Sequence, residues 1–248
     1  PNALDALFDG ADVAVNAIGI LREIGDQTFR KMHVTLAKRL VASSQAQGVG
    51  HLIQISALGV TDEADTPYFR TKFEAEQIIR SGGHDWTILR PSLVLGDGSG
   101  FMDLVKGWAT GRHSPYFFLP YFTRKENGRT VAPKVAPLDV ADLAWAVCES
   151  IENPNARGEV IHLTGPDVYE MPDLLLKLRE HIRNARPNMK TRGVPGALAA
   201  RLAGGAARLG LGDALPFDMG MAIMGARDSV APMRKARAIL GYDPGSIG

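Results

Sequence analysis

Short apolar runs alternate with helix-length amphipathic segments through the first two-thirds of this 248-residue chain. Such runs predict strands buried on both faces, and their alternation with helices predicts repeated strand–helix units that feed a parallel sheet. The runs lie at 11–19, 51–56, 86–91 and 158–163, and the helical segments at 28–47, 67–80, 140–151 and 172–184. We therefore expect an α/β fold with a doubly wound parallel sheet, whose strands end in polar or turn-forming residues at one binding edge.

The composition changes after residue 163. Residues 194–224 are rich in Ala, Gly, Leu and Met, and their only charges are Arg201, Arg208, Asp213 and Asp218. We expect two units, a sheet domain at 1–163 and a small, mostly helical lobe at 164–248. In the lobe, Leu198, Leu202 and Leu209 share one helical face, about a quarter turn from Arg201 and Arg208. Such a helix either packs on its own domain or lies at a membrane interface with its arginines reaching the headgroups.

Charge and cysteine content exclude several function classes. The chain has 28 Lys and Arg against 27 Asp and Glu, a balance that argues against a nucleic-acid-coating protein. Cys148 is the only cysteine, so an intrachain disulfide and a cysteine-based zinc site are both excluded. No run of about eighteen uncharged apolar residues occurs, so we expect no transmembrane span.

A serine, a tyrosine and a lysine carry the candidate chemistry. Ser56 ends the second apolar run, Tyr68 opens the following helix, and Lys72 shares a helical face with Tyr68 because the two are four residues apart. A nearby ammonium group lowers the pKa of a phenol, which favours proton transfer, and a serine hydroxyl can hydrogen-bond a substrate carbonyl. The alternative is a surface tyrosine beside a solvated lysine.

These residues carry a resemblance to a known family. Ser56, Tyr68-Phe-Arg-Thr-Lys72, Asp12-Val-Ala-Val-Asn-Ala-Ile-Gly19 and Arg90-Pro-Ser-Leu-Val-Leu-Gly96 resemble motifs of the extended or atypical short-chain dehydrogenases/reductases, which bind NAD(P) on a Rossmann fold. Within that family, Val15-Asn-Ala-Ile-Gly-Ile20 and Gly100-Phe101 are most similar to the nucleotide-binding accessory subunits of respiratory complex I and their bacterial relatives.

The resemblance implies roles for individual residues. Ser56, Tyr68 and Lys72 would be catalytic and would also contact the cofactor. The other implied cofactor-binding residues are Asn16, Ala17, Ile18 and Gly19 on the adenine side, and Pro91, Ser92, Leu93 and Val94 on the nicotinamide side. His33 is a departure, because many catalytic members carry Asn there as part of a proton relay. It either replaces that Asn in the relay or packs behind the sheet.

The resemblance also implies a cofactor, partners and a location. The cofactor is NAD(P)H, with NADPH favoured, and the partners are subunits of the peripheral arm of complex I. The implied location is peripheral, on the cytoplasmic side of a bacterial inner membrane or the matrix side of a mitochondrial one, with a soluble cytoplasmic protein as the alternative.

The glycine-rich phosphate loop of dinucleotide-binding folds is absent. No Gly-x-Gly-x-x-Gly follows a strand, and Gly204-Gly205 and Gly210-Leu-Gly212 lie late in the helical segment. By resemblance, residue 1 falls just before the family's fourth strand. The natural chain is thus expected to extend N-terminally by roughly 60 to 80 residues, a stretch that would include the residue selecting NAD or NADP.

A basic, aromatic segment follows the Arg-Pro motif. It is expected to be a loop that meets an anionic substrate, phospholipid headgroups or a partner, or that only covers the site with solvated charges. Its cations are Arg112, Arg124, Lys125, Arg129 and Lys134, and its aromatic residues are Tyr116, Phe117, Phe118, Tyr121 and Phe122.

Two functions remain open. The first is an NAD(P)H-binding accessory subunit or assembly partner of complex I, in which the dinucleotide mainly stabilises the fold. The second is an active reductase, dehydrogenase or epimerase on a carbonyl or sugar-nucleotide substrate. In that enzyme Tyr68 moves the proton, Lys72 anchors the ribose and Ser56 orients the substrate oxygen.

Overall fold

Four parallel strands form the central sheet of the computed structural model, which describes residues 3–208 and 217–247. The strands are β1 (Val13–Asn16), β2 (His51–Ile55), β3 (Asp85–Pro91) and β9 (Glu159–Leu163), in the order β1-β2-β3-β9. Every neighbouring pair is parallel. The four apolar runs are therefore confirmed as strands of a parallel sheet.

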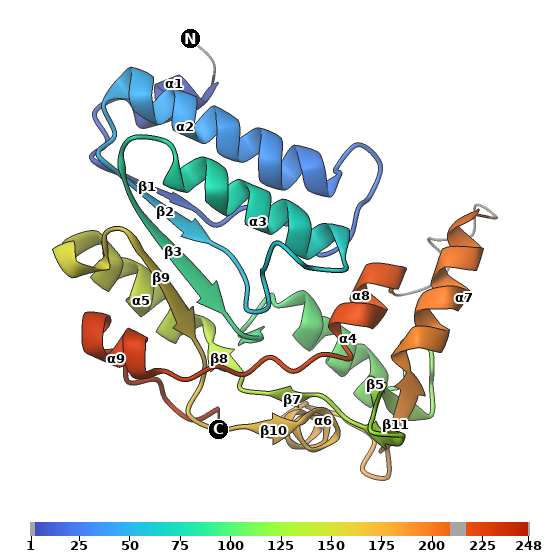
Figure 1. Cartoon of the computed structure of the whole chain (residues 1–248). Coiled ribbons are helices and arrows are strands. Elements are labelled where there is room, and N and C mark those ends of the chain that lie inside the picture. Colours follow the sequence, from blue (N-terminus) through green and yellow to red (C-terminus); the bar gives the residue numbers. More distant parts are fainter. Residues whose placement is uncertain (1–2, 209–216, 248) are drawn as a thin grey trace.

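Helices cover both faces of this sheet (Figure 1). On one face lie α1 (Ala3–Phe8), α2 (Leu36–Gln47) and α3 (Pro67–Arg80). On the other lie α5 (Val140–Glu152) and α9 (Arg234–Leu240). Alternate strand residues serve the two layers: Leu52 packs with the first group of helices and Ile53 with the second. This two-faced burial explains why the strands are continuously apolar.

Two of the expected helices differ from their predicted bounds. The segment expected at 28–47 starts as a π-helical turn, η1 (Arg30–Thr35), before it continues as α2 and ends at Gly48, whose φ of 76° suits glycine. The π turn carries His33, and such turns are frequent at functional sites. The helix expected at 172–184 is α6 (Met171–Glu180), and a series of turns follows it.

A lobe packs beside the carboxyl ends of the strands (Figure 1). Its sheet has the order β11-β5-β6, built from β5 (Phe118–Glu126), β6 (Arg129–Val131) and β11 (Lys190–Pro195). The helices around it are α4 (Gly100–Ala109), α6, α7 (Gly196–Arg208) and α8 (Met219–Met224). Short strand pairs link lobe and sheet: β4 (Val94–Leu95) with β8 (Leu138–Asp139), and β7 (Lys134–Val135) with β10 (Tyr169–Glu170).

One segment of the lobe corrects an expectation. Residues 118–126 were expected in a loop but form β5, because β11 pairs with them in parallel from 72 positions later in the chain, as in Lys190 opposite Phe118. Residues 190–195 are likewise a strand, beside the helices α6, α7, α8 and α9 of the same C-terminal segment. The elements of the lobe come from both sides of residue 163, and the division 1–163 and 164–248 stays a prediction.

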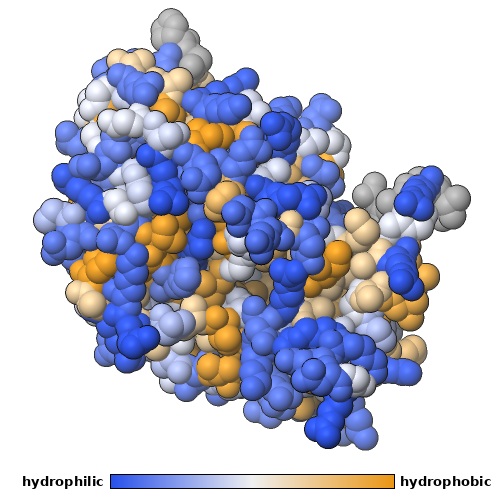
Figure 2. Space-filling view, in the orientation of Figure 1, coloured by the Kyte–Doolittle hydropathy of each residue, from blue (hydrophilic) through white to orange (hydrophobic). Residues whose placement is uncertain are grey.

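The helix predicted around Leu198 and Leu202 is α7, and both leucines are exposed on it. Figure 2 shows hydrophobic side chains on this side of the molecule, whereas most of the visible surface over α2 and α3 is hydrophilic. Gly204 and Gly205 lie within α7, while Leu209, Gly210, Gly212 and Asp213 lie outside the described residues. Across 3–208 and 217–247, no helix combines the length and apolarity needed to cross a membrane.

Candidate functional site

A cleft of about 480 Å³ lies between the carboxyl ends of β2 and β3 and the lobe. Parallel strands of a doubly wound fold present their ligand site at this edge. The predicted residues that line the cleft are Ser56, Tyr68, Pro91, Ser92, Leu93 and Val94. The lobe contributes Phe101, Met171, Met224 and Arg227. The sheet and the lobe thus bring together residues more than 170 positions apart.

Of the other predicted residues, Lys72 lies on α3 and the rest lie at the end of β1 or directly after it. Asn16, Ala17, Ile18, Gly19 and Lys72 are not among the residues that line this cleft. Gly19 nonetheless abuts the lysine, because a Cβ on it would lie 3.2 Å from the Lys72 Nζ. Asn16 donates to Gln54 Oε1 at 2.8 Å and accepts from the Ile18 amide at 3.1 Å, which fixes the turn at the strand end. Gln54, a buried polar residue within a strand, was not predicted as part of the site.

Tyr68 and Lys72 are both buried. Helix α3 begins at Thr66, whose side chain caps the Phe69 amide, and Pro67 occupies its first turn, so Tyr68 enters the helix at the cleft. The Lys72 Nζ lies 5.8 Å from the centre of the Tyr68 ring and donates to the Ile55 carbonyl at 3.1 Å. Tyr68 and Lys72 therefore lie on the same face of α3, as their spacing in the sequence predicts.

The pKa of Tyr68 shifts opposite to the sequence expectation. Burial raises it to about 12, because the phenolate would lose its hydration. Burial also lowers the pKa of Lys72 to about 8, although the carboxylate of Glu76 opposes that shift. Desolvation of the phenol is therefore the cause that sets the direction of this shift.

Ser56 belongs to a buried network that the sequence analysis missed. Its hydroxyl donates to Glu76 Oε1, and Glu76 is completely buried. Arg90 binds the same carboxylate through two hydrogen bonds, from Nε at 2.9 Å and from Nη2 at 2.6 Å. Helical spacing could have predicted this role for Glu76, because it lies four residues beyond Lys72 on the same face of a helix that packs on the sheet.

His33 has both ring nitrogens engaged. Nε2 accepts from the Ile20 amide at 3.5 Å, so the neutral ring carries its proton on Nδ1, which lies 2.9 Å from Thr71 Oγ1. The Thr71 hydroxyl donates to main-chain carbonyls of α3, so it can accept from Nδ1. Burial and the charge of Lys72 lower the pKa of His33 to about 4. These contacts favour the packing interpretation over the relay.

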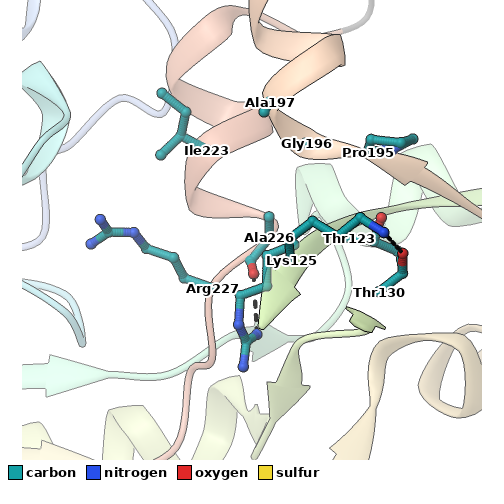
Figure 3. Close-up of a pocket in the computed structure, with 10 residues that line it drawn as sticks. Thr123, Lys125, Thr130, Pro195, Gly196, Ala197, Ile223, Ala226 and Arg227 are labelled. Carbon is teal, nitrogen blue, oxygen red and sulfur yellow. Dashed lines mark hydrogen bonds between the residues drawn. The ribbon is translucent and has the colours of Figure 1, made fainter. Parts of the chain in front are cut away.

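The basic segment forms part of a different hollow. Figure 3 shows this hollow, of about 340 Å³, where β5 meets the start of α7 and the end of α8. Its three cations all have protein partners. Arg124 pairs with Asp228 at 2.8 Å, Lys125 donates to Thr130 at 2.8 Å, and Arg227 pairs with Asp65. The hollow is therefore a weaker anion site than the sequence suggested.

Comparison with known proteins agrees with this geometry. The sequence profile of a family described as NAD(P)H-binding matches residues 1–106. The match to this NAD(P)H-binding family covers the part of the chain that holds β1, β2 and β3, and the fold is of the Rossmann type. The UDP-glucuronic acid 4-epimerase of Bacillus cereus, solved with UDP-glucuronic acid and NAD, has a similar fold. Its TM-score is 0.66 at 17% identity, over 99% of this chain and 74% of that one.

Two curated relatives bear on the wider family of this NAD(P)H-binding domain. Mitochondrial NADH dehydrogenase (ubiquinone) 1 alpha subcomplex subunit 9 of Arabidopsis thaliana is 26% identical over 73% of the chain and 43% of its own length. The (4-alkanoyl-5-oxo-2,5-dihydrofuran-3-yl)methyl phosphate reductase of Streptomyces griseus is 30% identical over 52% of the chain and 41% of its own length. The chain thus spans less than half of each relative.

Proposed function

We propose that this protein is an NADPH-holding accessory subunit or assembly partner of respiratory complex I, in which the dinucleotide mainly stabilises the fold. Its similarity to alpha subcomplex subunit 9 supports the partner. That relative's name describes it as mitochondrial. The location proposed with this function is peripheral, on the matrix side of a mitochondrial membrane or the cytoplasmic side of a bacterial one. A soluble cytoplasmic protein is the alternative.

The protonated state of the Tyr68 phenol is the observation that supports a structural role for the dinucleotide. A proton-transfer tyrosine works best with a pKa near the operating pH, and here burial raises the pKa of Tyr68 to about 12. The two groups that would assist proton transfer by Tyr68 already have hydrogen-bond partners within the protein. The Ser56 hydroxyl donates to Glu76, and the ring nitrogens of His33 are held by Ile20 and Thr71. This arrangement supports a phenol that stays protonated as part of the cleft wall rather than one poised to move a proton.

Lys72 and the end of β1 would hold the ribose and adenine ends of the dinucleotide in this proposal. Lys72 supplies a cation beside Gly19, where the absence of a side chain leaves room for close approach. Pro91, Ser92, Leu93 and Val94 border the nicotinamide end of the cleft. The dinucleotide, when bound, supplies a hydride donor, and the residues described above supply its position.

The second candidate function is an active NAD(P)H-dependent reductase, dehydrogenase or epimerase. Retention of Ser56, Tyr68 and Lys72 at the cleft favours it, as does the 30% identity to a Streptomyces reductase. In that reading Tyr68 transfers the proton, Ser56 orients the substrate oxygen, and Lys72 lowers the barrier by stabilising the phenolate.

Native mass spectrometry of the full-length protein tests the first proposal directly. We expect NADPH and complex I subunits to be released with it; a protein that carries neither overturns the proposal. Tyr68→Phe separates the two candidates, with Tyr116→Phe as the control because Tyr116 is half exposed in the lobe. The structural role predicts unchanged NADPH retention and assembly in Tyr68→Phe. Hydride transfer to a carbonyl panel that Tyr68→Phe alone abolishes would establish the enzyme instead.

A further inference from the structure

A second cavity, of about 260 Å³, lies inside the lobe. Side chains from α4, β5, β11, α6 and α8 line it, so it is enclosed by elements on several sides. The lining is almost entirely aromatic or aliphatic, and representative residues are Leu104, Trp108, Tyr121, Phe122, Leu175 and Val194. The cavity is smaller than the roughly 300–1,000 Å³ of pockets that hold a whole drug-sized ligand. It therefore has room for part of a small molecule.

This cavity adjoins the cleft at Ser56 and Tyr68, and residues common to both lie between them. Phe101, Met171, Met221 and Gly225 line both spaces. Two of these four are methionines, whose unbranched side chains adapt easily to the shape of a ligand. Gly225 lets the end of α8 approach the cavity wall, because a Cβ there would lie 2.8 Å from the Phe122 ring. A ligand in the cleft can thus extend into the lobe without leaving the protein.

The cavity offers little to a polar ligand. The indole N–H of Trp108 donates to the Ser114 carbonyl at 3.0 Å and is therefore already satisfied. None of the lining residues carries a charge. The hydroxyls of Ser114 and Tyr121 are the remaining polar side-chain groups of this lining. A charged group that entered would lose its hydration without a countercharge, whereas each buried methylene group gains free energy.

We infer that the lobe cavity binds the hydrocarbon portion of an amphipathic small molecule whose polar end lies in the cleft beside Ser56 and Tyr68. The inference rests on the proposed function only in that the polar end adjoins the dinucleotide site. It narrows the ligand class to compounds with an aliphatic chain. Sugar nucleotides, which are polar along their whole length, do not fit this cavity.

Quenching of Trp108 fluorescence tests the inference. Trp86→Phe and Trp145→Phe together leave Trp108 as the only tryptophan of these 248 residues, and any tryptophan outside them is likewise replaced by Phe. The bromine of a brominated alcohol quenches an indole that it touches. In the full-length protein we expect bromodecanol to quench saturably and to bind at least tenfold more tightly than bromoethanol, because it buries more methylene groups. Equal affinity for the two alcohols, or quenching that does not saturate, overturns the inference.

Variants of Leu104 test whether the hydrocarbon chain of the alcohol lies in this cavity. Leu104→Arg places a charge in the cavity and should remove the preference for bromodecanol, whereas Leu202→Arg, at a leucine 62% exposed on α7, should not. Leu104→Phe only narrows the cavity and should shift the preference to bromohexanol. If both Leu104 variants fold and keep the parent preference, the inference is wrong.

NADPH binding measured on the same samples separates this inference from the proposed function. Loss of NADPH binding with intact alcohol selectivity contradicts the proposed function alone. Intact NADPH binding without alcohol selectivity contradicts the cavity inference alone.

Discussion

Arg90 binds Glu76 through two hydrogen bonds, of 2.9 and 2.6 Å, and so joins the end of β3 to the middle of α3. The carboxylate also accepts the hydroxyl of Ser56, which lies at the cleft. One buried charge pair therefore fixes the relative positions of the end of β3, helix α3 and Ser56. Because the carboxylate is fully buried, its stability contribution depends on the presence of its partner.

We expect Glu76→Leu to lower the free energy of unfolding by about 3–5 kcal/mol, since it leaves the Arg90 charge without its partner. Glu76→Leu combined with Arg90→Met should recover most of that loss, because both charges are then gone. Urea unfolding of the full-length protein measures both. The control is the exposed pair of Arg30 and Glu74, where Glu74→Leu should cost no more than about 1 kcal/mol. A double variant as unstable as the single one would contradict the pair's role.

His33 predicts a pH dependence of stability. Its folded pKa of about 4 lies below its ordinary value of 6.5, so the unfolded chain binds more protons between these values. The contribution of His33 to stability is therefore complete above pH 6.5 and decreases as the pH falls towards 4. His33→Gln should flatten the stability profile in this window, whereas His181→Gln, on the exposed end of α6, should leave it unchanged. Thermal unfolding at half-unit pH steps provides the measurement.

Lys72 predicts a pH dependence of NADPH binding. Its pKa of about 8 in the empty protein means that the ammonium form predominates below pH 8 and is lost above it. If that cation holds the ribose, as proposed, the affinity for NADPH should fall as the pH rises through 8. Lys72→Met should bind more weakly and lose this pH dependence. Lys38→Met, at an exposed position of α2, should behave like the parent in a fluorescence titration.

Gly165 predicts a steric limit next to β9. A Cβ at this position would collide with the main-chain carbonyl oxygen of Pro137, and backbone cannot move aside as a flexible side chain can. Gly165→Ala should therefore destabilise the fold by about 1–3 kcal/mol. Gly245→Ala, where a Cβ would meet nothing within 4 Å, is the matched control. Equal urea midpoints for the two variants would show that the strand end adjusts freely.

Local pattern was enough to predict the sheet. The four apolar runs became β1, β2, β3 and β9, and helix α3 spans the predicted 67–80, because Pro67 and the Thr66 cap act within a single turn. The side-by-side placement of Tyr68 and Lys72 followed from helical periodicity alone. Strand β5 was missed because it depends on pairing with β11, a partner that no local window contains.

The sequence by itself determined the α/β sheet, the order of its units and the residue types present at the carboxyl edge. Only the tertiary structure decided what those residues do there. It assigned the Ser56 hydroxyl to Glu76, engaged both nitrogens of His33, and raised the pKa of Tyr68 where the sequence suggested a fall. The physical reason is that desolvation and hydrogen-bond partners depend on residues distant in the chain, whereas helical and strand periodicity depend on near neighbours.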